Sequence, residues 1–449
     1  MSLRDLLLAG ILATALPFVF RHAFIGILLW TWIGIMNPHK LAWGFMYNAP
    51  VAIIIAIVVL LAVFTTRDRV KLPLTSPLVF TALLLAWTCV TTAFAFFVSE
   101  STVQLEKVLK IQLMVFLSAA ILYKLEHIRL FIWVNVLSLA FYGIKGGLYT
   151  IRTAGGGKVW GPPGGFISGN NELALALIMA IPLMYFLWLT TPHTWLKRLM
   201  LVAMPLSVIS AIGTQSRGAL VAIVAMSAVL WWRAPGKLVN LLAISVLAAA
   251  VFAFMPQSWH DRMATIESYR DDSSAMGRII AWQTAINIAN DRVTGAGFEM
   301  YSRSIRRLST PQTDDDRFDV SIARAAHSIY FQVLGEHGYI GLVLFLLIWI
   351  TAWRVAGRLR KQDPNDPDSQ WLKHLGGMIQ VSLVGWLAGG AFLSLAYWDF
   401  PYNMVVMLVV AKRWSVERRS MPEVLPRTPP ENLQRLGTGQ RMLWWIRSA

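Results

Sequence analysis

The sequence contains little charge and almost no cysteine. Only 14% of its 449 residues are Asp, Glu, Lys or Arg, whereas a soluble domain carries about a quarter charged residues. The single cysteine, Cys89, lies in an apolar stretch, which excludes a disulfide framework. Cysteine pairs, an HExxH motif, a P-loop and a strand-to-helix GxGxxG motif are also missing. The acidic run at residues 314–316 has no second acidic cluster beside it, so we expect no metal and no cofactor.

The net charge of +16 could indicate a nucleic-acid-binding protein. The basic residues, however, are spread over short loops instead of forming one basic domain. Hydrophobic residues make up 56% of the chain, and 20 Trp and 22 Phe suit aromatic belts at two membrane interfaces. We therefore attribute the charge to positive-inside loops and contact with anionic membrane lipids, and predict no nucleic-acid partner.

Long apolar runs predict an all-α integral membrane protein of about 12 transmembrane helices, since a crossing needs about 20 apolar residues. The runs occupy residues 49–66, 77–97, 105–123, 128–146, 172–190, 198–214, 218–233, 238–255, 328–353 and 374–396, with a shorter one at 400–414. Residues 6–20 and 23–36 are each too short, and we interpret them as one broken crossing or a shallow hairpin. The preferred single crossing gives about twelve helices, and a double crossing gives about thirteen.

Lys and Arg in short loops set the orientation of the chain in the membrane. We place the basic segments at 67–71, 193–198, 232–237, 354–361 and 412–419 in the cytoplasm, together with both termini. The loops 98–104, 147–171 and 256–326 are then periplasmic. The predicted organisation is a transmembrane bundle (1–255), one large periplasmic loop carrying amphipathic helices (256–326), carboxy-terminal transmembrane helices (327–415) and a disordered cytoplasmic tail (416–449).

Two arginines stand where an anionic ligand could bind. Arg217 lies at the predicted outer end of a helix hairpin, where an arginine is costly unless it is paired or faces water. Its small neighbours Ser216 and Gly218 would let a ligand approach. Arg278 opens an amphipathic helix of the large loop, where free N–H groups add to the guanidinium. The alternatives are a snorkelling arginine at 217 and an exposed surface arginine at 278.

Three lysines break the positive-inside pattern. Lys107 and Lys110 are three residues apart and share a helix face, and Lys145 follows on the next helix. All three fall toward the periplasm in the predicted topology. Binding a diphosphate would explain them, and pairing with Glu100 or Glu106 would explain the first two equally well.

His327 stands where the large loop re-enters the membrane, followed by Ser328. A histidine titrates near neutrality and can take a proton from a sugar hydroxyl, although a lone interfacial histidine is also a common anchor. On one straight helix His337 would lie about 15 Å deeper and about 80° around the axis. We therefore expect His337, near mid-membrane and just before Gly338, to serve close helix packing.

These motifs resemble the bacterial O-antigen ligase and polymerase superfamily. The family pattern of His, then Asn, Ser or Gln, nine residues and Gly reads here as His327, Ser328, nine residues and Gly338. The family's Ser-Arg-Gly signature at a helix start matches residues 216–218, and an arginine of its large periplasmic loop matches Arg278.

Other stretches are similar to a subgroup of O-glycosylation ligases associated with exosortase-type exopolysaccharide systems. They comprise residues 36–40 (MNPHK) with 43–45 (WGF), and residues 161–164 (GPPG) followed by 170–172 (NNE). Together with the ligase motifs, this resemblance extends over about residues 1–415.

The resemblance implies an inverting, metal-independent glycosyltransferase that works on the periplasmic face with an undecaprenyl-diphosphate-linked glycan donor. His327 would orient or deprotonate the acceptor hydroxyl. The diphosphate would be held by basic side chains, namely Arg217, Arg278, Lys107, Lys110 and Lys145. An O-antigen ligase acting on lipid A–core ranks first. A protein O-oligosaccharyltransferase and an O-antigen or exopolysaccharide polymerase share the chemistry and stay open.

A polytopic membrane transporter is the alternative from another class. Transporters often show repeated halves and buried ionisable residues near the middle of the membrane. This sequence shows no evident internal repeat, and its unusual charges fall toward the outer surface. We therefore rank transport below glycosyl transfer.

Overall fold

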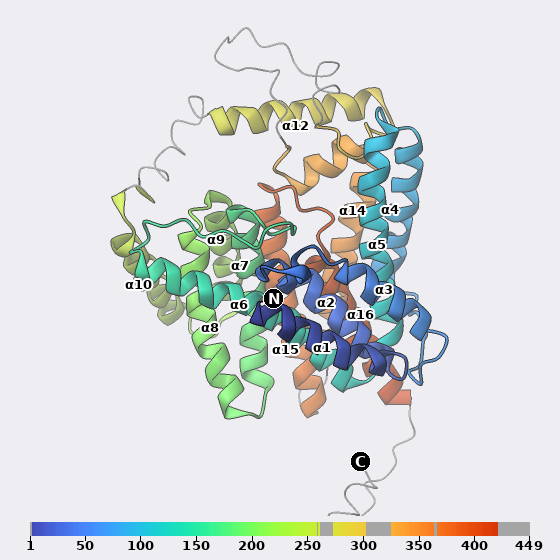
Figure 1. Ribbon diagram of the computed structural model, residues 1–449. Coiled ribbons are helices and arrows are strands. Elements are labelled where there is room, and N and C mark those ends of the chain that lie inside the picture. The colour runs from blue at the N-terminus through green and yellow to red at the C-terminus, as the bar shows by residue number, and fades with distance from the viewer. Residues whose placement is uncertain (1, 258, 261–272, 302–324, 363–365, 421–449) are drawn as a thin grey trace, which may run out of the picture.

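The computed structural model of the protein describes residues 2–257, 259–260, 273–301, 325–362 and 366–420. Within these ranges every regular element is a helix and none is a strand, which confirms the all-α class. Figure 1 shows a bundle of roughly upright helices with one further helix, α12, lying across its top.

The helices follow the predicted apolar runs. In the amino-terminal half they are α1 Leu3–Val19, α2 Ala23–Met36, η1 Pro38–Leu41, η2 Phe45–Asn48, α3 Val51–Ala62, α4 Ser76–Ala93, α5 Val98–Ile121 and α6 Leu125–Arg152. The remaining helices are α7 Asn170–Thr190, α8 Thr194–Gly213, α9 Arg217–Arg233, α10 Lys237–Phe254, α12 Ser273–Asp291, α14 Ile329–Arg360, α15 Pro367–Gly390 and α16 Asp399–Ser420.

The described residues hold five helices that are long and apolar enough to cross a membrane by length and composition, namely α4, α6, α7, α8 and α14. The total of about twelve crossings, the periplasmic loop and the division into four segments stay predictions. The predicted tail starts too early, because α16 continues to Ser420. Residues 421–449 lie outside the described part of the chain.

The amino-terminal helices α1 and α2 form an antiparallel hairpin. Asp5, near the start of α1, accepts a hydrogen bond from the backbone N–H of Met46 in η2, shortly before α3 (3.0 Å). The turn between the helices reaches the other end of α3, where Arg67 N–H donates to the carbonyl of Arg21 (3.0 Å). The preferred single crossing of residues 6–36 is therefore wrong. The amino terminus lies at the opposite end of α3 from the basic loop 67–71.

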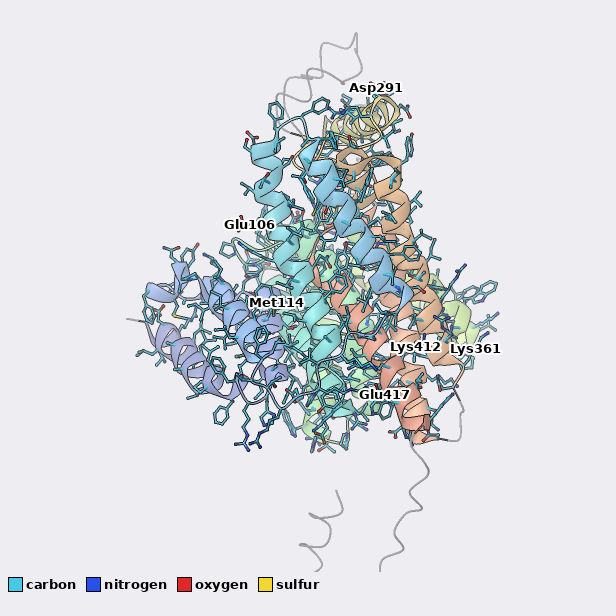
Figure 2. The ribbon with its side chains drawn as sticks, turned by 90° about the vertical axis from the view of Figure 1, so that its right-hand side faces the viewer. Glu106, Met114, Asp291, Lys361, Lys412 and Glu417 are labelled. Carbon is cyan, nitrogen blue, oxygen red and sulfur yellow. The ribbon has the colours of Figure 1, made fainter. Side chains whose placement is uncertain are left out.

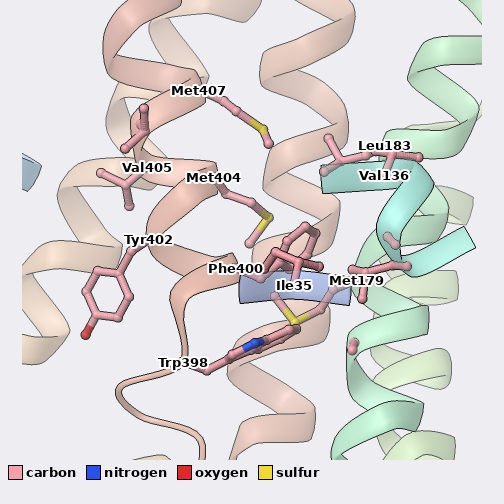
Figure 3. Close-up of a cluster of buried hydrophobic side chains, with 14 of the residues drawn as sticks. Ile35, Val136, Met179, Leu183, Trp398, Phe400, Tyr402, Met404, Val405 and Met407 are labelled. Carbon is pink, nitrogen blue, oxygen red and sulfur yellow. The ribbon is translucent and has the colours of Figure 1, made fainter. Parts of the chain in front are cut away.

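The core is built around α16. Its residues from Phe400 to Ala411 are all buried, although their sequence gave only a short apolar run. Figure 3 shows Met404 and Met407 of α16 pointing toward Met179 and Leu183 of α7. A helix that is apolar on all sides is surrounded by other helices. This packing fixes the linker 391–398, which leads into α16 at the predicted periplasmic end.

The amphipathic helix that was predicted to open at Arg278 is present as α12, which begins five residues earlier, at Ser273. Ile279 and Ile286 are exposed, whereas Ile280 is buried. The ring of Trp282 stacks on Phe331 of α14 at 4.9 Å between centroids. The apolar spacing therefore identified the helix, while the position of α14 decided which side of it packs.

Helix α14 is broken at Gly338, which has φ 67° and ψ −171°. The nine residues between Ser328 and Gly338 form a first helical part, and residues 339–360 form the second. A Cβ atom at position 338 would lie 2.2 Å from the carbonyl oxygen of Val293, so both the backbone angle and the close approach require glycine. His337 hydrogen-bonds with Thr91, close to the carboxy-terminal end of α4, so it does not lie midway along the bundle as the straight helix predicted.

Candidate active site

His327 occupies the turn that leads into the first part of α14. Its backbone has φ 44°, in the left-handed region that a non-glycine residue adopts at a cost of about 1–3 kcal/mol. Its N–H donates to the hydroxyl oxygen of Ser394 in the linker 391–398 (2.9 Å), which holds the turn in place. Among the described residues the ring Nδ1 is buried without a hydrogen-bond partner. The imidazole therefore keeps hydrogen-bonding capacity for a substrate.

Arg278 and Glu172 place charge around His327. Arg278 belongs to α12 and Glu172 to the first turn of α7. Electrostatic interactions join the guanidinium to both other side chains. Burial, and then the positive charge of Arg278, lowers the pKa of His327 below its ordinary value of 6.5. His327 is consequently neutral at pH 7 and able to accept a proton.

Arg217 is the first residue of α9. The Ser216 side chain caps this helix by accepting the N–H of Ala219 (3.3 Å). Gly218 lies against the same linker that holds His327, since a Cβ atom there would be 3.3 Å from Cβ of Phe392. The linker 391–398 is thus the common neighbour of the two helix starts.

A hydrogen bond connects the turn before α9, which contains Thr214, to the start of α7. The side-chain amide of Asn170, the first residue of α7, donates to the carbonyl of Thr214 (2.9 Å). Glu172, the partner of Arg278, follows two residues later. The starts of α7, α9 and α14 are therefore gathered at one end of the bundle. They bring Arg217 and His327 to the region that Arg278 reaches from α12.

Lys107 and Lys110 do not act together. The ammonium of Lys107 lies 4.1 Å from the ring centroid of Phe166. It also interacts electrostatically with Glu299 and, more weakly, with Asp399 at the start of α16. Lys110 forms an ion pair with Glu106 on the exposed side of α5. Figure 2 shows Glu106 on the upper part of that helix. The ion-pair explanation therefore holds for Lys110, and Lys107 is the lysine directed toward the linker region.

Lys145 lies in a separate pocket of about 260 Å³. Lys158 and Trp160, from the loop after α6, line the same pocket. The ammonium of Lys158 is 4.9 Å from the indole ring of Trp160. The sequence had grouped Lys145 with Lys107 as ligands of one diphosphate. In the structure Lys145 lines a pocket to which Lys107 does not contribute.

The sequence analysis missed a buried polar cluster at the far end of the first part of α14. The hydroxyl of Tyr397 donates to the carboxylate of Glu336 (2.6 Å). The hydroxyl of Thr91 hydrogen-bonds with Nδ1 of His337 (2.7 Å), and the ring is fully buried against Phe298. A glutamate and a histidine within an apolar run were the available signal. Their contacts are internal, so the cluster positions the helix that carries His327.

Two known protein families match parts of this chain. A family described as O-antigen ligase matches residues 202–346, which include Arg217, Arg278, His327 and Gly338. A family of unknown function matches residues 3–194. No curated protein matches the chain. The likeness to exosortase-associated ligases stays a prediction. The match over residues 202–346 covers about a third of the chain and supports the predicted resemblance to the O-antigen ligase superfamily, whose members are membrane ligases or polymerases of the glycosyltransferase type.

Proposed function

We propose that the protein is an O-antigen ligase of the bacterial inner membrane. It would transfer a glycan from undecaprenyl diphosphate to lipid A–core on the periplasmic face. The observation that supports this best is the half-buried imidazole of His327 within electrostatic reach of the guanidinium of Arg278. Transfer from a diphosphate carrier needs a base for the acceptor hydroxyl and a cation for the leaving group.

In the proposed step the acceptor hydroxyl oxygen attacks the anomeric carbon of the glycan. His327 takes the hydroxyl proton as the new carbon–oxygen bond forms. The bond from the anomeric carbon to the diphosphate oxygen breaks, and its electron pair leaves with undecaprenyl diphosphate. Direct displacement inverts the configuration. Arg278 and Arg217 would stabilise the charge that develops on the leaving group.

Of the three lysines predicted to bind the diphosphate, the proposal keeps only Lys107. Lys107 is directed toward the linker beside His327, so we retain it as a contact for the donor. Lys110 is already paired with Glu106, and Lys145 belongs to another pocket. We therefore no longer assign these two lysines to the diphosphate.

The experiment is a transfer assay with purified protein and a lipid-diphosphate glycan. Lipid A–core and a periplasmic protein are offered as acceptors in separate reactions, and a third contains donor alone. Glycosylated lipid A–core and released carrier are the expected products. Product on the protein alone would indicate an oligosaccharyltransferase, and longer carrier-linked chains would indicate a polymerase. Movement of donor across vesicles without any transfer would favour the transporter.

The same assay tests metal dependence. We expect a chelator to leave turnover unchanged, because the proposed chemistry relies on arginine and histidine. Activity that is lost on chelation and restored by magnesium would bring the acidic run at residues 314–316 into the site. That run lies outside the described residues.

A further inference from the structure

A pocket of about 410 Å³ lies at the end of the bundle opposite to His327. Two segments far apart in the sequence line it, residues 71–75 before α4 and the last part of α16. The residues used below are Lys71, Leu72, Leu74, Lys412, Val416 and Glu417. Figure 2 shows Lys412 and Glu417 near the lower end of α16. The basic loops place this end at the cytoplasmic surface of the membrane.

Arg413 fastens the two walls of the pocket to each other. Its guanidinium donates to three backbone carbonyls, those of Lys71 (2.6 Å), Ala119 (3.3 Å) and Leu122 (2.6 Å). The N–H of Lys71 donates in turn to the carbonyl of Ala120 (3.1 Å). The segment 71–75 is thus held against α5 and α16, and the pocket is formed without a ligand.

The pocket carries an excess of positive charge. Across the described part of the chain, no carboxylate pairs with the ammonium of Lys71 or of Lys412. Arg358 of α14 adds a further positive charge near Lys412. The one carboxylate in the lining, that of Glu417, is bound to Arg69 at 3.3 Å. An anionic group would therefore gain from both lysines without displacing an existing partner.

Large apolar side chains stand exposed beside these charges. Leu74 is 86% exposed, Val416 57% and Leu72 41%. A free phosphate or another small soluble anion would contact the lysines alone and none of this apolar surface. An occupant with an anionic head and hydrocarbon chains would satisfy both parts of the pocket.

We propose that this pocket binds one anionic phospholipid of the cytoplasmic leaflet. The lipid phosphate lies between Lys71 and Lys412, and its acyl chains run along Leu72, Leu74 and Val416. Basic pockets between transmembrane helices on the cytoplasmic side bind such headgroups. This site is independent of glycosyl transfer at the other end of the helices.

The test uses native mass spectrometry of the full-length protein, delipidated in detergent and titrated with phosphatidylglycerol or phosphatidylcholine. The native protein should retain one phosphatidylglycerol in preference to phosphatidylcholine. Lys71→Gln with Lys412→Gln should weaken phosphatidylglycerol binding by about 30-fold, since each lysine near the surface contributes roughly a factor of five. The control double variant, Lys197→Gln with Lys361→Gln, removes two other predicted cytoplasmic lysines and should bind normally.

Leu74→Gln separates a lipid from a soluble anion, because it keeps both lysines and removes apolar contact. It should also weaken phosphatidylglycerol binding, and glycerol phosphate should fail to compete at equal concentration. Thermal unfolding curves that match the native protein establish that each variant is folded. Equal loss in the two double variants would overturn the proposal in favour of diffuse attraction. Competition by glycerol phosphate, or native affinity of Leu74→Gln, would overturn it in favour of a soluble anion.

Discussion

Replacing Gly338 by alanine tests whether the break in α14 builds the site. The φ of 67° and ψ of −171° fall in a region used almost only by glycine, which costs another residue about 1–3 kcal/mol. The new Cβ would also lie 2.2 Å from the carbonyl oxygen of Val293, and overpacking costs typically about 1–3 kcal/mol. Together the two effects predict a loss of about 2–6 kcal/mol in the free energy of unfolding.

The strain should reach the site through the loop that packs on the break. The N–H groups of Ala296 and Gly297 donate to the carbonyls of Gly335 and Glu336, both at 2.9 Å. Pushing Val293 away disturbs these bonds and the short helix that starts after His327. We expect Gly338→Ala to unfold at a clearly lower temperature in detergent and to lose transfer activity.

Gly357→Ala is the matched control, because it lies on the second part of the same helix. Its new Cβ would meet only the side-chain amide of Gln380 at 3.5 Å, an ordinary contact. Alanine is favoured over glycine inside a helix by about 1 kcal/mol, so this variant should be as stable as the native protein or more so. If Gly338→Ala behaved like Gly357→Ala, the break would not be needed for the fold or for activity.

Three further predictions concern the diphosphate, pH and topology. Arg217→Lys should lose most transfer activity in folded protein, because a point charge does not reproduce a bidentate guanidinium on phosphate oxygens; near-native turnover would leave Arg217 a snorkelling residue. Burial and the charge of Arg278 lower the pKa of His327 below 6.5, so the midpoint of the acid-side fall in kcat/KM should lie below pH 6.5; a midpoint above pH 6.5 would contradict this. Reporter fusions at Ser2 and Asp316 should signal the periplasm and a fusion at Asp366 the cytoplasm; a cytoplasmic signal at Ser2 would contradict the α1–α2 hairpin as a double crossing.

The helices themselves could be predicted because the membrane imposes their length and composition. The apolar run at 172–190 became α7 Asn170–Thr190 and the run at 218–233 became α9 Arg217–Arg233, with boundaries shifted by only a few residues. The amino-terminal hairpin could not be chosen over a single crossing, because two short apolar runs are compatible with both. The contact between Asp5 and Met46 decides between them.

Candidate residues for the site could be selected from the sequence, but their geometry could not. Arg217, Arg278 and His327 were singled out because cations and a titratable ring are unusual at a membrane surface. Periodicity assumed that α14 was straight, and the left-handed angle at Gly338 depends on a loop some forty residues away in the sequence. The internal pairing of Lys110 and the hydrogen bond between Tyr397 and Glu336 likewise depend on tertiary neighbours that spacing does not reveal.

The most direct test of the account is the transfer rate of His327→Ala with a lipid-diphosphate glycan and its acceptor. The variant removes only the imidazole, and an unfolding curve that matches the native protein would show that it is folded. Loss of the base predicts a rate lower by at least about 100-fold, the range of general acid–base catalysis. Near-native turnover by folded His327→Ala would show that His327 is an interfacial anchor and that it does not deprotonate the acceptor.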